Sequence, residues 1–371
     1  MKKIVVNKND IVNNVKILRD LVEEKCKKTN SKAADIIAVV KANGIGLGLV
    51  EYSKILKESG IKYLAVATVE EVKELVDAKL SDDLFMLSPI NDKEELEYLI
   101  QNDITITIGS KLNFDLAEEI CSKLNKKVKA HTKIDVGLGR YGFMYNDFES
   151  IKYVYENAKN VEFIGIYTHL VNSEDKKFAY SQFEKYNKVV EFLKENNFEV
   201  GIRHVAASRP FVLYDDMMLD SVRFGSIITG RTPFKIEGLK KVGEYVTSVS
   251  EIRSIPKGHT ISYGSEYKAK KDMRVAIIST GYIDGLGWAK EREVYNLKNN
   301  IKDIIKTILK LFKKEKFKVI INNKKYNTVG RFGMFHTVIN IENDDIKVND
   351  IVKIEDLHVA HANPNIRREY I

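Results

Sequence analysis

Cysteine is scarce in this chain of 371 residues, which contains only Cys26 and Cys121. The two residues show neither a CxxC spacing nor the dense pattern of a small secreted domain held together by disulfides. We therefore expect two reduced thiols in a cytoplasmic protein.

Long apolar runs are also missing. The first six residues imitate the start of a signal peptide, but the polar residues 7–10 end that run far short of an export core. No stretch approaches the roughly 20 apolar residues that a membrane-spanning helix needs. We expect a soluble protein without a membrane partner.

Internal repeats and low-complexity linkers are absent as well, and the composition, 44% hydrophobic and 30% charged, is that of a globular protein. The length exceeds one ordinary domain, so two domains are expected. The net charge of +8 raises the question of a nucleic-acid partner. Most lysines are scattered among glutamates, however, and the densest basic cluster, residues 310–318, fits the end of an amphipathic helix. We expect a solvated surface and no nucleic-acid binding.

Short β-branched runs alternate with helical segments up to about residue 234. The runs are 36–40, 63–66, 84–87, 104–106, 128–134, 163–167 and 202–205, and the helical segments include 11–22, 69–78, 114–124 and 183–193. This alternation predicts a parallel sheet with crossover helices, and the number of repeats fits a closed α/β fold, the (β/α)₈ TIM-type barrel. Functional residues of such a barrel belong at the C-terminal ends of its strands.

The pattern changes after Pro233. Strand-like segments at 243–252, 275–278, 319–321, 337–341 and 351–354 follow without regular crossover helices, which predicts a mainly β domain. Apolar positions at helical spacing in 301–314 predict one packed surface helix within it. We place the barrel in residues 1–236 and the β domain in residues 237–371.

Lys41 is the first candidate for chemistry. It follows the apolar run 36–40 and precedes the glycine-rich turn 42–48, so it is held where a carbonyl cofactor could reach it. The simple alternative is a lysine at a strand end, with its stem along the core and its ammonium group in water. This segment alone favours that alternative, because short motifs without context are often false.

Further segments change that balance. Residues 133–143 form a second strand followed by a glycine-rich turn, and they carry Lys133 and Arg140. His169 ends a third apolar run, Arg223 and Gly225 lie near a fourth, and Tyr263 stands in a Ser-Tyr-Gly turn much later. In this order and at these separations, the segments resemble the alanine racemase family of pyridoxal-phosphate enzymes. The resemblance extends from the first helix to the turn at residues 330–331.

The resemblance implies a homodimeric amino-acid racemase with pyridoxal 5'-phosphate as cofactor and no metal ion. Racemisation removes the α-proton from one face and returns it to the other, so two bases on opposite sides are expected. Lys41 would be both the Schiff-base lysine and one base. Tyr263 would be the other base, contributed by the second subunit, whose β domain caps the barrel mouth of its partner. His169 would lie behind that tyrosine and share a hydrogen-bond relay with Arg223.

The resemblance also assigns the cofactor contacts. Arg223 would face the pyridine nitrogen, and because arginine stays protonated it would donate a hydrogen bond without readily protonating that nitrogen. Ser208, Gly225 and Ser226 would hold the phosphate. Without the resemblance, Ser208 would be a simple helix N-cap, and Arg223 would pair with Asp220 at the surface.

Four more residues complete the predicted site. Arg140 would contact the phenolic oxygen of the cofactor and the carboxylate of the substrate. Lys133 matches a family position that is often carbamylated, where the added negative charge holds that arginine. Tyr282 and Met334 match residues that line the entrance and contact substrate across the dimer.

This chain departs from the family pattern at three positions. Ile45 and Ile366 replace two tyrosines on the phosphate side, and Phe335 follows Met334 where the family typically has aspartate. We expect weaker cofactor binding, at about 1 kcal/mol for each lost hydroxyl, and a pocket that accepts alanine or a larger amino acid. The alternatives are a related barrel decarboxylase and a regulatory protein that binds the cofactor without turnover. The cysteine-and-aspartate loop usual in such decarboxylases is absent from the sequence, which disfavours the first.

Overall fold

The computed structural model describes residues 2–32, 34–287, 300–305, 307–308, 317–355 and 357–371. The chain forms two compact units, Lys8–Val242 and a second unit that joins Met1–Asn7 to Gly243–Ile371. The sequence placed the boundary between residues 236 and 237.

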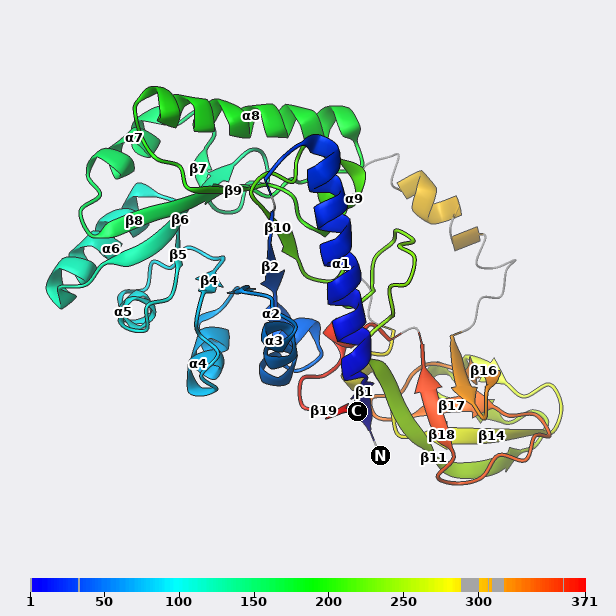
Figure 1. Cartoon of the computed structure of the whole chain (residues 1–371). Helices are drawn as coiled ribbons and strands as arrows, with labels where there is room; N and C mark the ends of the chain where they lie inside the picture. The colour runs from blue at the N-terminus through cyan, green and yellow to red at the C-terminus, as the bar shows by residue number, and fades with distance from the viewer. Residues whose placement is uncertain (1, 33, 288–299, 306, 309–316, 356) are drawn as a thin grey trace. The chain divides into compact units, whose positions relative to one another are not determined.

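Parallel strands form the centre of the first unit (Figure 1). One sheet has the order β10-β2-β3-β4 and another the order β5-β6-β8-β9. A parallel bridge between Phe85 and Thr105 joins them at one seam, and the Asp220 N–H donates to the Arg203 carbonyl at 3.1 Å beside the other. The predicted (β/α)₈ barrel is therefore confirmed. Within the described residues its eight strands are β2 (Asp35–Val39), β3 (Tyr63–Val66), β4 (Leu84–Met86), β5 (Ile106–Ile108), β6 (Val128–Asp135), β8 (Val161–Tyr167), β9 (Ile202–His204) and β10 (Ser221–Phe224).

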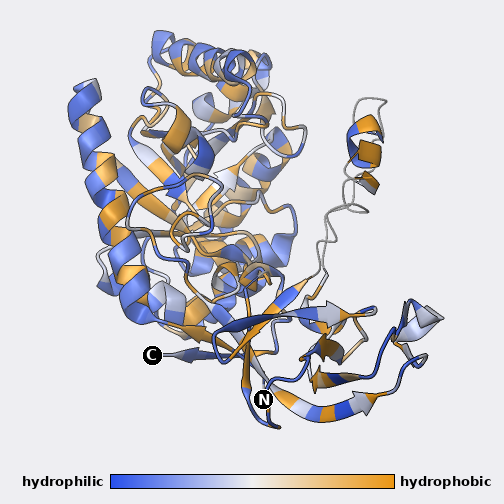
Figure 2. Ribbon diagram, turned by 90° about the vertical axis from the view of Figure 1, so that its right-hand side faces the viewer, coloured by the Kyte–Doolittle hydropathy of each residue, from blue (hydrophilic) through white to orange (hydrophobic). Residues whose placement is uncertain are grey.

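Amphipathic helices cover the strands, with hydrophobic residues concentrated in the interior (Figure 2). Several begin at residues whose side chains accept from the first helical turn, and Thr68 and Ser110 form complete capping boxes. A short strand, β7 (Phe143–Met144), pairs with β6. The helices are α1 (Lys8–Thr29), α2 (Lys41–Ile45), α3 (Leu49–Glu58), α4 (Val69–Asp77), α5 (Lys93–Gln101), α6 (Lys111–Leu124), α7 (Phe148–Glu156), α8 (Lys176–Glu195) and α9 (Ser208–Leu213).

The second unit is mainly β, as predicted, and its largest sheet has the order β14-β17-β16-β15-β18-β11-β1-β19. The run that imitates a signal peptide is strand β1, which lies between β11 and β19 with Ile4 and Val6 fully buried. The strands of this sheet are β1 (Lys3–Val6), β11 (Glu244–Ile255), β14 (Met273–Ile278), β15 (Lys318–Ile321), β16 (Lys324–Val329), β17 (Thr337–Asn340), β18 (Ile351–Ile354) and β19 (Arg367–Tyr370), and β12 (Thr260–Ile261) pairs with β13 (Tyr267–Lys268) beside it.

The helix predicted at 301–314 lies only partly within the described residues, where 300–305 and 307–308 are helical. Its predicted packing is wrong for this part, because Ile301, Ile304, Ile305 and Ile308 are each 46 to 58% exposed. The helical spacing predicted the secondary structure correctly. Spacing cannot show whether another element covers the apolar face.

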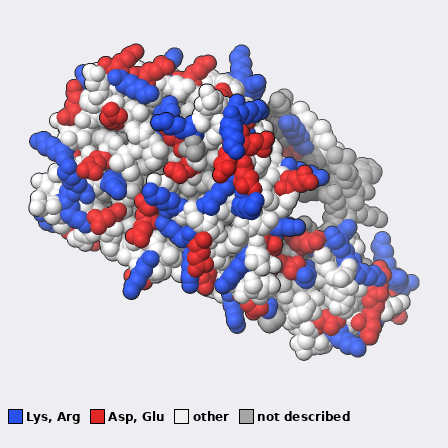
Figure 3. All heavy atoms as spheres, viewed as in Figure 1, with Lys and Arg blue, Asp and Glu red and all other residues white. Residues whose placement is uncertain are grey.

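Three features hold for the described residues as a whole, and a fourth for one face of the molecule. No helix among them is both long and apolar enough to cross a membrane, and no group of histidine, cysteine and acidic side chains among them could hold a metal ion. Cys26 and Cys121 are buried free thiols. On the face seen in Figure 3, basic and acidic side chains are interspersed.

Candidate functional site

Lys41 stands at the C-terminal end of β2 and begins an unusual turn, α2. The next four residues all have positive φ: Ala42 at 57°, Asn43 at 55°, Gly44 at 62° and Ile45 at 54°. Left-handed backbone is costly for residues with a Cβ, and for a β-branched isoleucine it is a genuine outlier. The turn must therefore be stabilised by the residues around it.

Two side chains hold the turn. Glu71, in the first turn of α4, accepts the Ala42 N–H at 2.6 Å through Oε1, while its Oε2 accepts the N–H groups of Ala67 and Thr68 at 3.0 and 3.3 Å. Asn43 Oδ1 accepts the Leu49 N–H at 2.9 Å. The connection after β2 is thereby tied to the neighbouring connection after β3.

The Lys41 amine has the electrostatic surroundings of a reactive group. Desolvation by the surrounding protein and then the charge of Arg140 lower its pKa, and Glu71 opposes them. Lys41 as a whole is an exposed residue, as the simple strand-end alternative requires. That alternative does not account for the strained turn that follows.

Arg140 lies at the end of a turn that one carboxylate organises. Asp135, at the end of β6, accepts four backbone N–H groups, with Oδ1 receiving those of Gly137 and Leu138 and Oδ2 those of Gly139 and Arg140, at 2.7 to 3.2 Å. These bonds fix the backbone at Arg140, and they thereby restrict the positions that its side chain can reach.

Lys133 lies within the barrel, only 4% exposed, with its ammonium group 5.1 Å from the centroid of the Tyr167 ring. Burial, followed by the charges of Arg140, Arg223 and Lys41, lowers its pKa to about 8. Near that pH a large share of the Lys133 amine is therefore neutral. Only the neutral amine can react with carbon dioxide.

Arg223 is buried in β10 and its guanidinium meets neutral acceptors. It donates to the carbonyls of His204, Thr168 and Val205 and, at 2.8 Å, to Nδ1 of His204. Burial lowers the pKa of Arg223 to about 10, so it stays protonated at neutral pH. The predicted alternative is wrong, because Asp220 pairs with Arg203 instead, at 2.8 Å.

His204 joins Arg223 to a second buried histidine, His131. Because arginine only donates, His204 Nδ1 must be an acceptor, and burial keeps the pKa of His204 well below its usual value. The neutral ring then carries its proton on Nε2, which lies 2.7 Å from Nδ1 of His131. The pKa of His131 is lowered to about 3 by burial and then by Arg223, so its proton is on Nε2. Arg223 thereby fixes the tautomers of both histidines.

His169 follows the end of β8. Desolvation first, and then the charges of Arg223, Arg140, Lys133 and Lys41, lower its pKa to about 3, although part of the ring is open to solvent. A pKa this low keeps His169 neutral, so its ring has one nitrogen that donates a hydrogen bond and one that accepts. Lys41, Arg140 and His169 follow the C-terminal ends of β2, β6 and β8, and the Lys133 ammonium and the Arg223 guanidinium both lie within 5.3 Å of the centroid of the Tyr167 ring.

The predicted phosphate contacts lie at the ends of β9 and β10. Ala207 forms a parallel bridge with Arg223, which brings Ser208 close to the turn that contains Gly225 and Ser226. Ser208 is the first residue of α9 and Ala207 is its N-cap, so the N-cap alternative is wrong. Both serines are half-buried, and neither hydroxyl bonds to any residue that the structure describes.

In the second unit, three predicted residues lie on loops that are joined by hydrogen bonds. Tyr263 is 77% exposed at the start of a 3₁₀ turn, and Ser262 before it accepts the Arg331 N–H at 2.8 Å. Tyr282, which is 53% exposed, donates its N–H to the Gly333 carbonyl at 3.0 Å, next to Met334. The β unit thus presents Tyr263, Tyr282 and Met334 on connected, exposed loops.

Comparison with known proteins agrees with this geometry. The family model of the alanine racemase N-terminal domain matches residues 6–233, and that of the alanine racemase C-terminal domain matches residues 242–363. The chain belongs to the alanine racemase family. Members of this family are pyridoxal-phosphate-dependent racemases, a kind of isomerase.

Individual relatives cover almost the whole chain. An alanine racemase of Methanococcus maripaludis is 30% identical over 354 residues, which are 93% of this chain and 86% of the relative. One of Clostridium perfringens is 32% identical over 354 residues, 92% and 82% of the two chains. The solved alanine racemase of Clostridium difficile 630 aligns with a TM-score of 0.85 at 25% identity, covering 100% of this chain and 95% of that one.

Ile45, where this chain departs from the alanine racemase pattern, lies beside the predicted phosphate contact Gly225. A Cβ added to Gly225 would lie 3.8 Å from Ile45 Cδ1 and 3.7 Å from Val39 Cβ. An apolar side chain thus stands beside Gly225 where the family usually has a phenol. Ile366 is buried in the β unit, and Phe335 is 48% exposed beside Met334.

Sequence reasoning missed three residues of the candidate site, Glu71, Asp135 and His204, and also His131, which His204 contacts nearer the opposite end of the strands. Two signals were available. Thr68 followed three residues later by Glu71 has the spacing of a capping box, and Asp135 precedes a glycine-rich turn. The histidine contacts had no local signal, because they depend on which strands are adjacent in the barrel.

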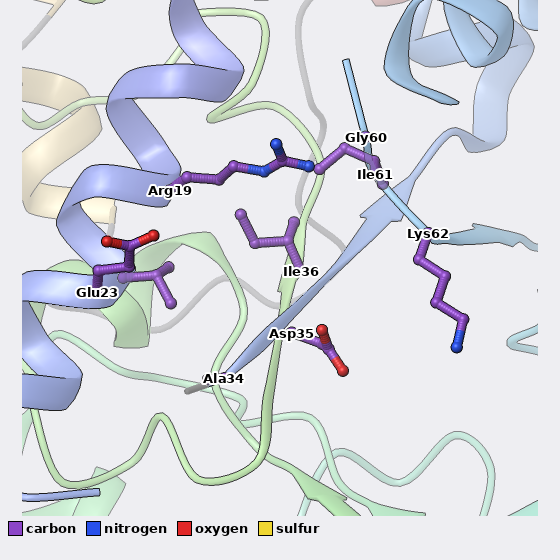
Figure 4. Close-up of a pocket in the computed structure, with 9 residues that line it drawn as sticks. Arg19, Glu23, Ala34, Asp35, Ile36, Gly60, Ile61 and Lys62 are labelled. Atoms are coloured by element: carbon purple, nitrogen blue, oxygen red, sulfur yellow. The ribbon is translucent and has the colours of Figure 1, made fainter. Parts of the chain in front are cut away.

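Cavities also occur at the opposite end of the barrel strands. One of about 170 Å³ lies where β2 begins, and there Arg19 of α1 points its guanidinium towards Gly60 (Figure 4). Another, of about 270 Å³, is lined by His131, Phe85 and Lys129. Active sites of such barrels lie at the other end.

Proposed function

We propose that this chain is a pyridoxal-phosphate-dependent amino-acid racemase that acts as a homodimer with shared active sites. Lys41 would be one base and Tyr263 of the partner subunit the other. The observation that carries the proposal is the set of basic side chains at one end of the barrel strands: Lys41 and Arg140 follow the ends of β2 and β6, and the Lys133 ammonium and the Arg223 guanidinium lie 5.1 and 5.3 Å from the centroid of the Tyr167 ring. Such a site suits an anionic ligand that reacts with an amine.

The residues at the strand ends fit the cofactor. The half-buried hydroxyls of Ser208 and Ser226 have no protein partner among the described residues, and any side chain at Gly225 would approach Val39 and Ile45. These groups and the nearby backbone amides would hold the phosphate. Arg223 would donate to the pyridine nitrogen, and Arg140 would contact the phenolic oxygen. When bound, pyridoxal phosphate supplies an electron sink that makes the α-proton of an attached amino acid acidic.

The protein groups then decide which proton transfers occur. Lys41, whose pKa is lowered by desolvation and Arg140, is suited to accept the α-proton and to return it on one face of the substrate. Tyr263 would exchange a proton on the opposite face. Arg223 is a permanent donor without a carboxylate partner among the described residues, so it would moderate the electron sink and restrain side reactions.

A dimer would cover the exposed loops of the β unit. Tyr263, Tyr282, Met334 and Phe335 are between 46 and 77% exposed, and clustered exposed aromatic and methionine side chains are typical of an interface. In the dimer, Tyr282 and Met334 would line the entrance and contact substrate. We also expect the enzyme to work in the cytoplasm, where its two free buried cysteines would stay reduced.

The substrate would be alanine or a larger amino acid. The substitution at Ile45 leaves aliphatic carbon atoms where the family usually has a phenol, so the pocket is more apolar there. The same departure favours the second candidate, a cofactor-binding protein without turnover.

The test incubates purified protein with pyridoxal phosphate and single L-amino acids, and measures the D-enantiomer by chiral chromatography. We expect D-product from at least one amino acid, and none from a Lys41→Ala variant. If no standard amino acid yields D-product, the racemase proposal is wrong and the regulatory alternative is favoured.

A further inference from the structure

Glu71 bridges two connections at the candidate active-site end of the barrel. One carboxylate oxygen accepts the N–H of Ala42, the residue after Lys41, at 2.6 Å. The other accepts the N–H groups of Ala67 and Thr68, between β3 and α4. Of these three bonds, only the one from the N-cap residue Thr68 belongs to an ordinary capping box, so the contact to Ala42 needs another explanation.

The contact to Ala42 is made where the backbone is most strained. Ala42 is the first of four residues with positive φ, three of which carry a Cβ. Each such residue costs free energy that the surrounding contacts must offset. A charge-assisted hydrogen bond at the first of them holds the left-handed conformation and, through it, the direction in which the Lys41 side chain leaves the chain.

We propose that Glu71 is a positioning residue for Lys41, whose hydrogen bond to the Ala42 N–H holds the amine in reach of its aldehyde partner. This inference rests on the proposed cofactor chemistry. It assigns Glu71 no contact with substrate or cofactor.

Glu71 also acts on Lys41 through its charge, independently of its hydrogen bond to Ala42. The groups that act on Lys41 are Arg140, on the turn after β6, and Glu71, on α4, while Lys133 on β6 and His169 after β8 are affected by Lys41 in turn. Among the described residues, Glu71 is the carboxylate that raises the pKa of Lys41 against desolvation and Arg140. Removing its charge should lower the pKa of Lys41 further.

The experiment uses cofactor-free full-length protein and the variant Glu71→Gln. Pyridoxal phosphate is added, and absorbance follows the condensation of the Lys41 amine with the aldehyde, which forms a C=N bond and releases water. In parallel, Lys41 is reductively methylated with formaldehyde and a mild borohydride across a range of pH, and peptide mass spectrometry measures the extent. The second measurement needs no cofactor.

Two control variants separate positioning from general stability. Thr68→Ala removes the hydroxyl that accepts the Glu71 N–H at 3.3 Å and weakens the α4 cap, but leaves the contact to Ala42 in place. Glu70→Gln removes one negative charge from the exposed neighbouring position. If Glu71 served only as a cap, Glu71→Gln and Thr68→Ala would behave alike.

We expect Glu71→Gln to lower the limiting rate of condensation at high pH by about tenfold, because the amide has no charge and only one accepting oxygen for the N–H groups of Ala42, Ala67 and Thr68. The pH midpoint of Lys41 methylation should fall in Glu71→Gln and stay unchanged in both controls. A limiting rate and midpoint equal to those of the wild type would overturn the inference. If wild-type protein does not condense with pyridoxal phosphate but the midpoint still falls, the proposed cofactor is wrong while Glu71 still acts on Lys41.

Discussion

Arg223 donates a hydrogen bond of 2.8 Å to Nδ1 of His204 inside the barrel. Both side chains are buried, and no carboxylate among the described residues accepts from this guanidinium. The contact allows His204 only one neutral tautomer and, through Nε2, also fixes that of His131. A protonated arginine in this setting is a donor of constant charge.

The first prediction concerns this contact. His204→Leu removes the acceptor and leaves a guanidinium N–H unpaired in the core, so the free energy of unfolding should fall by about 2 kcal/mol. Urea denaturation measures the change. His259→Leu, at an exposed position, should have a much smaller effect. Equal stabilities of the two variants would show that the buried contact contributes nothing.

The second prediction concerns the turn that carries Arg140. Asp135→Asn can satisfy only two of the four N–H groups that the carboxylate accepts, because the amide nitrogen is a donor. Arg140 should then be less well placed for the substrate carboxylate, and KM should rise about tenfold with a smaller change in kcat.

Asp147→Asn is the matched control for this variant. It makes the same chemical change at a helix cap, where Asp147 Oδ1 accepts the Ser150 N–H at 3.1 Å and an asparagine can do the same. Its KM should equal that of the wild type. An unchanged KM in Asp135→Asn would contradict the role assigned to Arg140.

The third prediction concerns the phosphate side of the site. Ile45→Tyr would restore a hydroxyl beside Gly225 and replace a β-branched residue at a φ of 54°. Affinity for pyridoxal phosphate, measured by reconstitution of cofactor-free protein, should rise about fivefold, the value of one hydrogen bond. Ile45→Phe has the same ring without the hydroxyl and should gain much less. Equal affinities of the two variants would place the phosphate elsewhere.

The fourth prediction concerns pH and Lys133. Only a neutral amine adds carbon dioxide, and burial and neighbouring cations lower the pKa of Lys133 to about 8. With ¹³C-labelled bicarbonate, the NMR signal of a carbamate should therefore grow as the pH rises through about 8. The signal should be missing in Lys133→Met. A signal of the same size in that variant would assign carbamylation to another lysine.

The sequence predicted the barrel well because its strands are largely buried and read as short apolar runs: residues 84–86 are all buried, and residues 63–66 are buried except for the half-buried Tyr63. Strand β1 was missed for a physical reason. Its basic start resembles that of a signal peptide, and only pairing with β11 and β19, more than 200 residues away, makes it a central strand.

The residues of the candidate site also fall into two groups, those that the sequence predicted and those that it did not. Lys41, Arg140 and His169 follow apolar runs, so their place at the strand ends could be predicted locally. The contacts of His204 and Glu71 could not be assigned, because the contact to Arg223 joins two neighbouring strands and the contact to Ala42 joins two neighbouring strand connections of the closed barrel. A sequence pattern gives the order of strands along the chain but not the side chains that meet across two of them.

The most direct test of the central claim mixes two inactive variants, Lys41→Ala and Tyr263→Phe, under conditions that exchange subunits. If Lys41 works with Tyr263 of the partner subunit, each mixed dimer contains one intact site and one that lacks both bases. Racemase activity should then return to about a quarter of the wild-type value, because half of the dimers are mixed and half of their sites are intact. If mixed dimers form and activity does not return, the two bases do not meet across a dimer interface and the account is wrong.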